Sequence, residues 1–461
     1  MKRFFALVVL FATMIGGASA QQNGFDKNNS VVYEMNIRQA TVEGTFAAAE
    51  QYLPELKNMG VDIVWLMPVS PIGVDERKGT LGSYYSIIDY KAINPEFGTM
   101  EDFQSFLNKA HDLGLKVIID WVANHTSRDA KWWNEGKQDW YVMDYNTGKP
   151  IVEYDWTDIA KLNYENQDMR LAMIDALKFW VEMGVDGYRC DVAMNVPGDF
   201  WAEAWKQVRE INPDVYLLAE GEETWLHESG FDATYAWELH HIFNAMAKGG
   251  SETKNVAGDG TIKTDAKYVK DLKEYLERDD QKYPAPAMRL MFTSNHDENS
   301  WAGTEFERMG DAHKTFAALT FVLPKSQPLI YTGQEIGLNR RLAFFEKDSI
   351  EELVDLEYGK EYRDFYKGLT AFRHNNSVLA AGANVAPVVY VEDAPEAVLA
   401  FTRENEENKV LCIFNFSAEP QTLTLSENAA GKYNCLCGEQ REYAAGDVVE
   451  LEPWAYMLLS K

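Results

Sequence analysis

Four segments of the sequence carry carboxylates directly after short apolar runs. They are residues 120–125 (Asp-Trp-Val-Ala-Asn-His), 187–191 (Gly-Tyr-Arg-Cys-Asp), 219–222 (Ala-Glu-Gly-Glu) and 295–298 (Asn-His-Asp-Glu). A single carboxylate at the end of a buried strand is commonly a helix cap or a structural partner. Four such segments, together with an arginine and two histidines, bring like charges close together. This clustering costs stability and is expected only where function requires it. The pattern therefore predicts an active site built on carboxylates.

Glycoside cleavage is the chemistry that two neighbouring carboxyl groups in opposite protonation states can perform. One delivers a proton to the leaving oxygen, and the other faces the developing positive charge. Arg189 lies two residues before Asp191, so in a strand both side chains project to one face, and the guanidinium is expected to keep Asp191 ionised as a nucleophile. Glu220 has no neighbouring cation in the sequence, which suits a proton donor. His125 and His296 lie beside these carboxylates and are expected to hydrogen-bond sugar hydroxyls.

The elements that must position these residues alternate between short β-rich runs and longer helical patterns from about residue 30 to 375. The eight expected strands are 31–35, 61–67, 116–121, 185–190, 215–219, 231–235, 289–294 and 328–332. This alternation predicts an α/β fold, a (β/α)8 TIM barrel, whose catalytic groups lie at the carboxyl ends of the strands. An open doubly wound sheet is the alternative, but no Gly-rich phosphate loop follows the first strand, which argues against a dinucleotide-binding version.

Two further regions flank or interrupt the predicted barrel. Residues 126–162, polar and aromatic, are expected to form a small inserted subdomain after the third strand, because long excursions in compact folds usually have a function. Its Trp132 and Trp133, and elsewhere Trp225 and Trp237, are candidates for stacking on sugars, with core packing as the alternative. Residues 376–461 alternate in short runs and predict a C-terminal antiparallel β-sandwich of about eight strands, which leaves 21–375 as the catalytic domain.

The first twenty residues have the pattern of a secretory signal peptide. Lys2 and Arg3 precede an apolar run, residues 4–15, that is too short to span a bilayer, and Ala18-Ser19-Ala20 supplies small residues for cleavage before Gln21. A membrane anchor is the alternative. We expect residues 1–20 to be removed, the protein to be exported to the periplasm or the medium, and the mature chain to have no membrane span.

Composition limits the partners of the chain. With 44 Lys and Arg against 72 Asp and Glu, the formal net charge of −28 repels a phosphate backbone, so no nucleic-acid partner is expected. Aromatic residues make up 13%, which suits both sugar stacking and large cores. The four cysteines form no disulfide framework, although a bridge from Cys412 to Cys435 or Cys437 stays open.

The four carboxylate segments resemble, in order and spacing, the four signature regions of the α-amylase superfamily, glycoside hydrolase family 13. The resemblance covers roughly residues 30 to 460. It implies Asp191 as the nucleophile, Glu220 as the general acid/base and Asp297 as the carboxylate that binds hydroxyls of the distorted sugar. It also implies a retaining mechanism, for which the two carboxyl groups lie about 5–5.5 Å apart.

The same resemblance extends to residues that bind the sugar. Residues 82–90 are similar to the family segment whose Tyr stacks on the sugar at the cleaved end, and the spacing assigns that role to Tyr85 rather than Tyr84, with Asp89 nearby. Arg189 joins the substrate-binding set on the same grounds. Asn124 corresponds to a calcium ligand of the family, and Asp155 or Asp158 could contribute, so calcium is a candidate cofactor.

One departure from the family pattern leaves the substrate open. Many α-amylases place Lys-His shortly after the nucleophile, whereas this chain continues with residues 192–195 (Val-Ala-Met-Asn). The main hypothesis is hydrolysis of α-1,4-glucosidic bonds in starch or maltodextrin. The alternatives on the same machinery are an exo-acting maltogenic enzyme, an α-glucosidase, a glucanotransferase and a neopullulanase-type or α-1,6-cleaving enzyme. A non-catalytic relative is disfavoured, since all three carboxylates and Arg189 are present.

Overall fold

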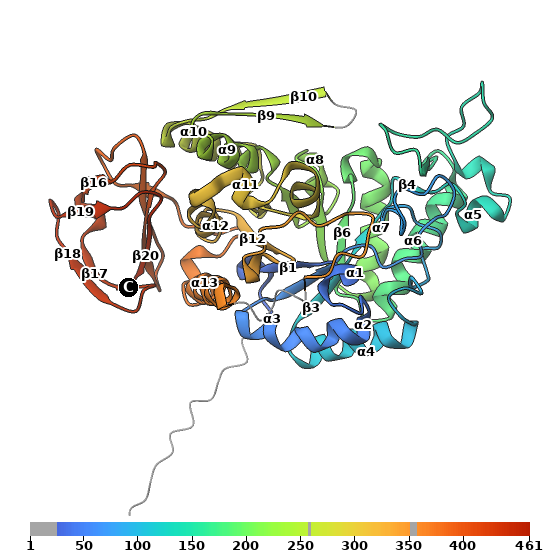
Figure 1. Ribbon diagram of the computed structural model, residues 1–461, viewed down its shortest axis with the longest axis horizontal. Helices are drawn as coiled ribbons and strands as arrows, with labels where there is room; N and C mark the ends of the chain where they lie inside the picture. The colour runs from blue at the N-terminus through green and yellow to red at the C-terminus, as the bar shows by residue number, and fades with distance from the viewer. Residues whose placement is uncertain (1–24, 257–259, 351–356) are drawn as a thin grey trace, which may run out of the picture.

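A computed structural model describes residues 25–256, 260–350 and 357–461, so the predicted signal peptide lies outside the described residues. Its centre is a closed barrel of eight parallel strands in the order β1-β12-β11-β8-β7-β6-β3-β2, which confirms the predicted fold class (Figure 1). The barrel strands are β1 (Val32–Met35), β2 (Ile63–Leu66), β3 (Lys116–Trp121), β6 (Gly187–Cys190), β7 (Tyr216–Ala219), β8 (Ala233–Tyr235), β11 (Met288–Met291) and β12 (Ser326–Tyr331).

The apolar runs form strands because each strand is buried on both faces, as parallel barrels require. Val32 is paired with Ile63 on one side and Leu329 on the other, and all three belong to the core inside the barrel. Alternate residues such as Tyr33 point outward into the core shared with the helices. At the start of β6 only glycine fits, because a Cβ on Gly187 would lie 2.0 Å from a backbone carbonyl oxygen of the neighbouring strand.

Helices surround the barrel, and several begin at side chains that cap their free N–H groups. Thr99 and Asp102 form a capping box at the start of α4, and the Asn166 side chain accepts from a backbone N–H of α6. The helices are α1 (Ile37–Ala40), α2 (Phe46–Ala49), α3 (Leu53–Met59), α4 (Met100–Asp112), α6 (Gln167–Glu182), α7 (Gly198–Ile211), α8 (Trp225–Glu228), α9 (Trp237–Ala247), α10 (Val269–Lys282), α11 (Glu305–Met309), α12 (His313–Thr320) and α13 (Glu357–His374).

Two excursions leave the barrel near the carboxyl ends of its strands. The inserted subdomain after β3 contains β4 (His125–Ser127), α5 (Lys131–Asn134) and β5 (Ile159–Lys161), and β4 pairs with β5 in antiparallel fashion. A hairpin of β9 (Ser251–Val256) and β10 (Gly260–Asp265) follows α9, and the sequence analysis did not predict it. In Figure 1 the hairpin runs along the top of the barrel, and the subdomain lies at the end opposite the C-terminal domain.

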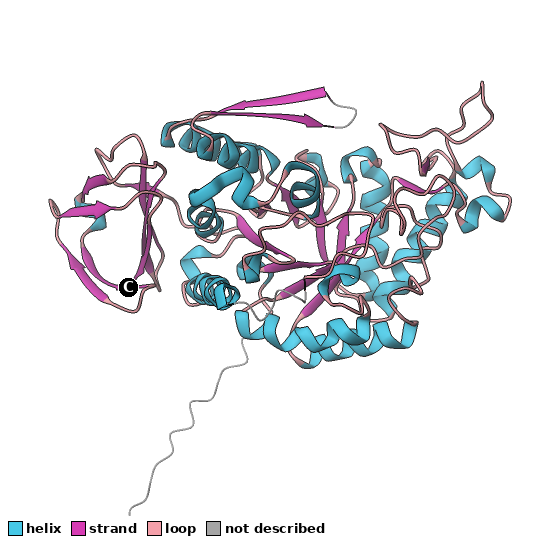
Figure 2. Cartoon of the chain, viewed as in Figure 1, coloured by secondary structure: helices cyan, strands magenta, loops and turns pink. Residues whose placement is uncertain are grey.

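The C-terminal domain consists of antiparallel strands (Figure 2). A six-stranded sheet has the order β13-β14-β15-β20-β17-β18, and β16 pairs with β19 in a second sheet. Residues of both sheets, such as Leu411 and Leu423, share one core. The strands are β13 (Val389–Tyr390), β14 (Val398–Glu404), β15 (Lys409–Asn415), β16 (Gln421–Thr424), β17 (Gly431–Cys435), β18 (Gln440–Tyr443), β19 (Val448–Leu451) and β20 (Tyr456–Ser460).

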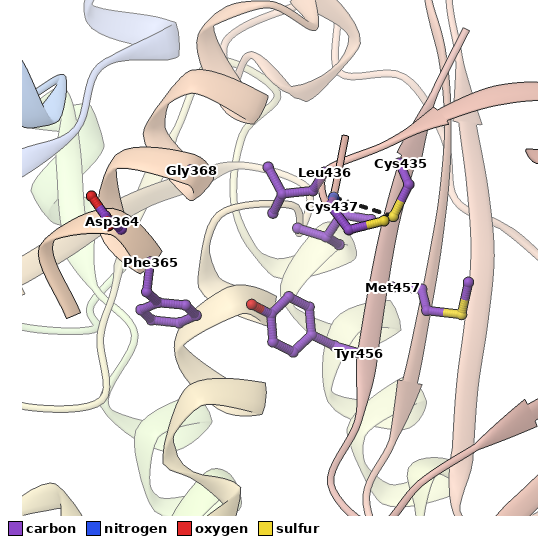
Figure 3. A pocket seen from close by; sticks show the side chains of 9 residues that line it. Asp364, Phe365, Gly368, Cys435, Leu436, Cys437, Tyr456 and Met457 are labelled. Atoms are coloured by element: carbon purple, nitrogen blue, oxygen red, sulfur yellow. Dashed lines mark hydrogen bonds between the residues drawn. The ribbon is translucent and has the colours of Figure 1, made fainter. Parts of the chain in front are cut away.

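The barrel and the C-terminal domain meet at α13. Phe365 of α13 packs edge-on against Tyr456 of β20, with ring centroids 6.2 Å apart, beside a small hollow of about 280 Å³ (Figure 3). Cys435 and Cys437 line this hollow as free thiols, and Cys412 is also free, so the disulfide that the sequence left open is not formed. Within the described residues no helix has the length and apolar character needed to span a membrane.

Candidate active site

The guanidinium of Arg189 is the centre of the predicted site. Its Nη1 donates to Asp120 Oδ1 at 2.9 Å and to Asp191 Oδ1 at 3.1 Å, and its Nη2 donates to Glu220 Oε2 at 2.6 Å. These groups come from the ends of β3, β6 and β7, which the barrel brings together. Arg189 is fully buried and holds the three carboxylates in place, and its expected role in substrate binding stays a prediction.

Glu220 lies beside a cation, contrary to the expectation drawn from its sequence neighbours. Besides Arg189, the backbone N–H of Val192 donates to Glu220 Oε2 at 2.9 Å. Val192 has φ of 36°, in the left-handed region, which a β-branched residue adopts only under strain. The turn after Asp191 is therefore strained, and its peptide N–H is directed at the carboxyl group of Glu220.

Burial and the charge of Arg189 act on the pKa of Asp191 in opposite directions. Burial raises the pKa of Asp191 well above its usual range, and Arg189 only partly offsets this, since the carboxylates of Glu220, Asp120 and Asp297 also raise the pKa. Burial likewise raises the pKa of Asp120 against the opposing effect of Arg189. Arg189 therefore offsets the effect of burial on Asp191 only in part, because one guanidinium contacts three carboxylates.

Asp297 and His296 extend the cluster from the end of β11. The Asp297 side chain is 36% exposed and lies 3.5 Å from His296 Nε2. His296 Nδ1 lies 2.5 Å from Glu34 Oε1, and its Nε2 lies 2.9 Å from the Tyr85 hydroxyl. Burial lowers the pKa of His296, but Asp297 and Glu34 outweigh it and raise the pKa to about 9. At neutral pH His296 is therefore a cation that donates from both ring nitrogens.

Tyr85, not Tyr84, lies in the cluster, as the sequence spacing predicted. The Tyr85 hydroxyl donates to Asp120 Oδ2 at 3.0 Å, and its ring stacks on His296 with centroids 5.5 Å apart. Tyr84 is buried away from solvent, and the guanidinium of Arg38 lies over its ring at 4.2 Å. The half-buried ring of Tyr85 thus has the position that a sugar-stacking residue needs.

A family model described as the catalytic domain of α-amylase matches residues 25–366, about three quarters of the chain. The chain belongs to the α-amylase family of glycoside hydrolases. A second model, the C-terminal domain of maltogenic amylase, matches residues 388–458.

Three relatives illustrate the similarity to the family. An α-amylase of Haloarcula japonica is 30% identical over 91% of this chain, which spans 60% of that protein's length. The crystal structure of an α-amylase from Lactobacillus plantarum has a TM-score of 0.80 at 28% identity, and the match covers 94% of this chain and 99% of that chain. A maltogenic α-amylase from Thermotoga neapolitana has a TM-score of 0.81 at 26% identity, over 95% and 99% of the two chains.

His125 lies beside the cluster without a hydrogen bond to its carboxylates. Burial lowers the pKa of His125 to about 4, so the ring is neutral, and it hydrogen-bonds the backbone of Tyr85. Its Nδ1 lies 3.1 Å from the side-chain nitrogen of Asn124. The predicted sugar contact of His125 remains a prediction, and the structure adds a role in holding the Tyr85 segment.

The surroundings of Asn124 do not fit a calcium ion. The Asn124 side chain hydrogen-bonds Glu153, whose other oxygen is paired with the ammonium of Lys161. Asp158 faces Lys78 at 3.6 Å, and Asp155 contributes only a backbone carbonyl to that lysine. Calcium needs six to eight oxygen ligands, and the described residues hold no cluster of three acidic, His or Cys side chains suited to a metal. No step of the mechanism below involves calcium.

Asp89 bonds to lysines outside the carboxylate cluster, and its predicted contact with substrate stays a prediction. Its Oδ2 accepts from Lys131 Nζ at 2.9 Å, and its Oδ1 accepts from the backbone N–H of Lys91 at 3.0 Å. Asp89 therefore ties the inserted subdomain to the barrel. The reason is tertiary, since Lys131 begins α5 and no local pattern predicts that the two side chains meet.

The predicted sugar-stacking tryptophans of the subdomain are packing residues. Trp132 lies 5.0 Å from the Tyr90 ring and 5.1 Å from the Trp140 ring, and Trp133 lies 5.4 Å from Tyr141. Both are half-buried against the core of the barrel. Core packing thus accounts for one side of each ring, and the predicted stacking on sugars stays a prediction.

Sequence reasoning also missed a second cluster of charged side chains, which is centred on Glu298, the residue after Asp297. Glu298 is fully buried, with His240 Nε2 at 2.9 Å, Arg308 Nε at 4.0 Å and an ion pair to Lys254 of β9. Two signals were available. Residues 251–256 alternate and are followed by Gly258-Asp259-Gly260, a turn pattern, and Glu298 directly follows a predicted catalytic residue.

Proposed function

We propose that this chain hydrolyses α-1,4-glucosidic bonds of starch, maltodextrin or related α-glucans with retention of configuration. The observation that carries the proposal is the contact of one buried guanidinium, Arg189, with both Asp191 and Glu220. Two carboxyl groups that bind the same guanidinium are close neighbours, as the separation of about 5–5.5 Å in retaining enzymes requires.

In this mechanism Glu220 protonates the glycosidic oxygen while Asp191 attacks the anomeric carbon, so that the leaving sugar departs and a glycosyl ester of Asp191 forms. Glu220, now ionised, takes a proton from water, which attacks the anomeric carbon and releases Asp191. Asp297 binds hydroxyls of the distorted ring, and His296 adds a positive charge beside it. The position of Arg189 supports the proposal, because its charge favours the ionised form of Asp191 against the effect of burial.

A maltose-releasing activity is the second candidate. Met194 stands near where many family members carry Lys-His, and its side chain is exposed beside Gly221, which follows Glu220. The Lys-His pair is therefore replaced here by Met194 and Asn195. The similarity to a maltogenic α-amylase and to a maltogenic amylase C-terminal domain also supports this candidate.

We also propose that the protein is exported, on the strength of the charged, apolar and small-residue pattern of residues 1–20. N-terminal sequencing of the protein from its host tests this, with Gln21 as the expected first residue.

A product time course on soluble starch, pullulan and maltotriose, followed by chromatography, tests the activity. Mixed-length oligosaccharides appearing early from starch support an endo-acting α-amylase. Maltose or glucose alone from the outset supports the exo-acting candidate, and cleavage of pullulan supports a neopullulanase-type enzyme. No product from any of the three would overturn the proposal.

A further inference from the structure

Trp301 is the tryptophan most open to solvent among the described residues. Its side chain is 55% exposed, and the other tryptophans are buried or half-buried. It lies in the π-helix η5 (Glu298–Ala302), which begins directly after Asp297. One exposed apolar side chain needs no explanation by itself, so its position and contacts decide what it does.

The contacts of Trp301 connect it to the candidate active site through a row of rings. Trp301 lies 5.3 Å from Phe344 and 5.6 Å from Phe345, centroid to centroid. Phe344 in turn stacks on Tyr85 at 6.3 Å with an interplanar angle of 15°. Tyr85, Phe344, Phe345 and Trp301 thus form a continuous aromatic ladder from the buried carboxylates to solvent.

The outer end of the aromatic ladder is rigidly supported. The backbone N–H of Leu342 donates to Asn299 Oδ1 at 2.7 Å, and Ser300 Oγ donates to the Leu342 carbonyl at 2.9 Å. Asn299 Nδ2 also donates to the Arg340 carbonyl at 3.2 Å. These bonds fix the π-helix to the loop that carries Phe344, so the Trp301 backbone is held in place before any ligand arrives. A fixed flat ring binds a partner at a low cost in conformational entropy.

We propose that Trp301 is a stacking platform for the glucosyl ring next to the reacting ring, on its non-reducing side. This rests on the proposed function, in which Tyr85 and Asp297 contact the reacting ring. The ladder leads outward from Tyr85, and the π-helix that carries Trp301 begins directly after Asp297, so the platform adjoins the two residues that contact the reacting ring in the proposed function. The site therefore favours a maltosyl or longer glycone over a single glucosyl group.

Polar groups at the platform suit a sugar, since saccharide and other small-ligand sites combine flat apolar contacts with a few placed polar groups. Arg341 and Glu307 form an ion pair at 2.8 Å beside Gly303, two residues after Trp301, and both side chains are about half exposed. The proposal includes these two side chains as hydrogen-bonding groups for hydroxyls of a ring stacked on Trp301.

The test compares W301A and W301F with the wild type on p-nitrophenyl α-glucoside and p-nitrophenyl α-maltotrioside. We expect W301A to lower kcat/KM on the maltotrioside about tenfold more than on the glucoside, the effect of one stacking contact. W301F, which keeps a flat ring, restores most of the preference. Y145A is the matched control, because Tyr145 is a fully exposed ring of the inserted subdomain, and it leaves the ratio of the two substrates unchanged.

Binding of maltotriose to D191N and to D191N/W301A by calorimetry measures the platform without turnover, with about tenfold weaker binding expected for the double variant. An equal loss on both p-nitrophenyl substrates, or equal binding by D191N and D191N/W301A, overturns the platform while leaving the proposed function intact. A wild type that cleaves neither p-nitrophenyl substrate counts against the proposed function instead, and the calorimetric result then decides the platform alone.

Discussion

Two groups of buried charges adjoin the carboxyl ends of the barrel strands, and their central residues, Arg189 and Glu298, have opposite charges. Around Arg189 one guanidinium serves Asp120, Asp191 and Glu220. Around Glu298 a single carboxylate faces Lys254, Arg308 and His240. In the first group three carboxylates contact one cation and the group reaches solvent at Asp297, whereas in the second one buried carboxylate contacts three basic side chains.

The difference appears in the protonation of the central carboxylates. Burial raises the pKa of Asp191, and Arg189 does not fully offset it. Burial acts on Glu298 in the same direction, but His240, Lys254 and Arg308 outweigh it and hold the pKa of Glu298 well below its usual range. Because burial lowers the pKa of His240 to about 4, Lys254 and Arg308 are the lasting charges at neutral pH. A carboxyl group that shares a proton can act as an acid or a base, whereas a carboxylate that stays ionised holds its cationic partners in place.

Replacing the central carboxylate of the first group should have the largest effect on activity. We expect D191N to lower turnover by several orders of magnitude, about 4–7 kcal/mol in the barrier, because the nucleophile is lost. Activity assays on starch check this, and residual activity near that of the wild type would remove Asp191 from the nucleophile role.

The same substitution should stabilise the fold at neutral pH. A raised folded-state pKa means that ionised Asp191 costs stability at any pH above the ordinary carboxyl range. D191N removes this cost, so its melting temperature exceeds that of the wild type at pH 7, and the gain shrinks as the pH falls toward 4. A lower melting temperature at pH 7 would contradict the excess of carboxylates.

Replacing the central carboxylate of the second group should instead destabilise the protein. E298Q leaves buried cations without their partner and is expected to cost about 3–5 kcal/mol in the free energy of unfolding. The pKa of Glu298 is depressed in the folded protein. Its stabilising contribution, which E298Q removes, is therefore complete above the ordinary carboxyl pKa and disappears only as the pH falls through the folded-state pKa.

Urea denaturation at pH 7 measures this effect. E361Q is the matched control, because Glu361 is exposed and its pair with Lys314 should contribute no more than about 1 kcal/mol. Equal effects of the two substitutions would show that the Glu298 network is not a supporting element.

His296, beside Asp297 in the first group, offers a smaller and more local test. We expect an imidazole pKa of about 9 for His296 by NMR titration, since Glu34 and Asp297 favour its charged form. A raised pKa means that the stabilising contribution is complete below the ordinary value near 6.5 and is lost as the pH rises through about 9. Titration at or below 6.5 would show that these carboxylates do not govern the ring.

Calcium removal should have the smallest effect. Lys161 supplies the positive charge beside Glu153, next to Asn124, so chelation by EDTA is expected to leave the melting temperature unchanged. Thermal unfolding with and without EDTA measures this. A fall of several degrees, restored by added calcium, would contradict the assignment of this position to Lys161.

The barrel and the carboxylate cluster were predictable because their signals are local. An apolar run marks a buried parallel strand, and the residue after it reaches the common mouth of the barrel, as for Asp191 and Glu220. Glu34 could not be assigned in this way, because it joins His296 only through closure of the barrel between β1 and β12.

Exposure and long-range pairing set the limit of sequence reasoning. Trp132 and Trp301 are chemically identical, yet the first packs against Tyr90 and the second faces solvent, which only the folded chain decides. The pairing of Lys254 with Glu298 required the β9–β10 hairpin, whose turn lies outside the described residues.

Trapping of the glycosyl ester tests the central claim most directly. The enzyme is incubated with 5-fluoro-α-glucosyl fluoride or a maltosyl equivalent, which slows release of the sugar, and the modified peptide is identified by mass spectrometry. We expect one fluoroglycosyl group on Asp191 of the wild type and no label on the D191N variant. A label on Glu220 or Asp120, or turnover with inversion and no label, would contradict it.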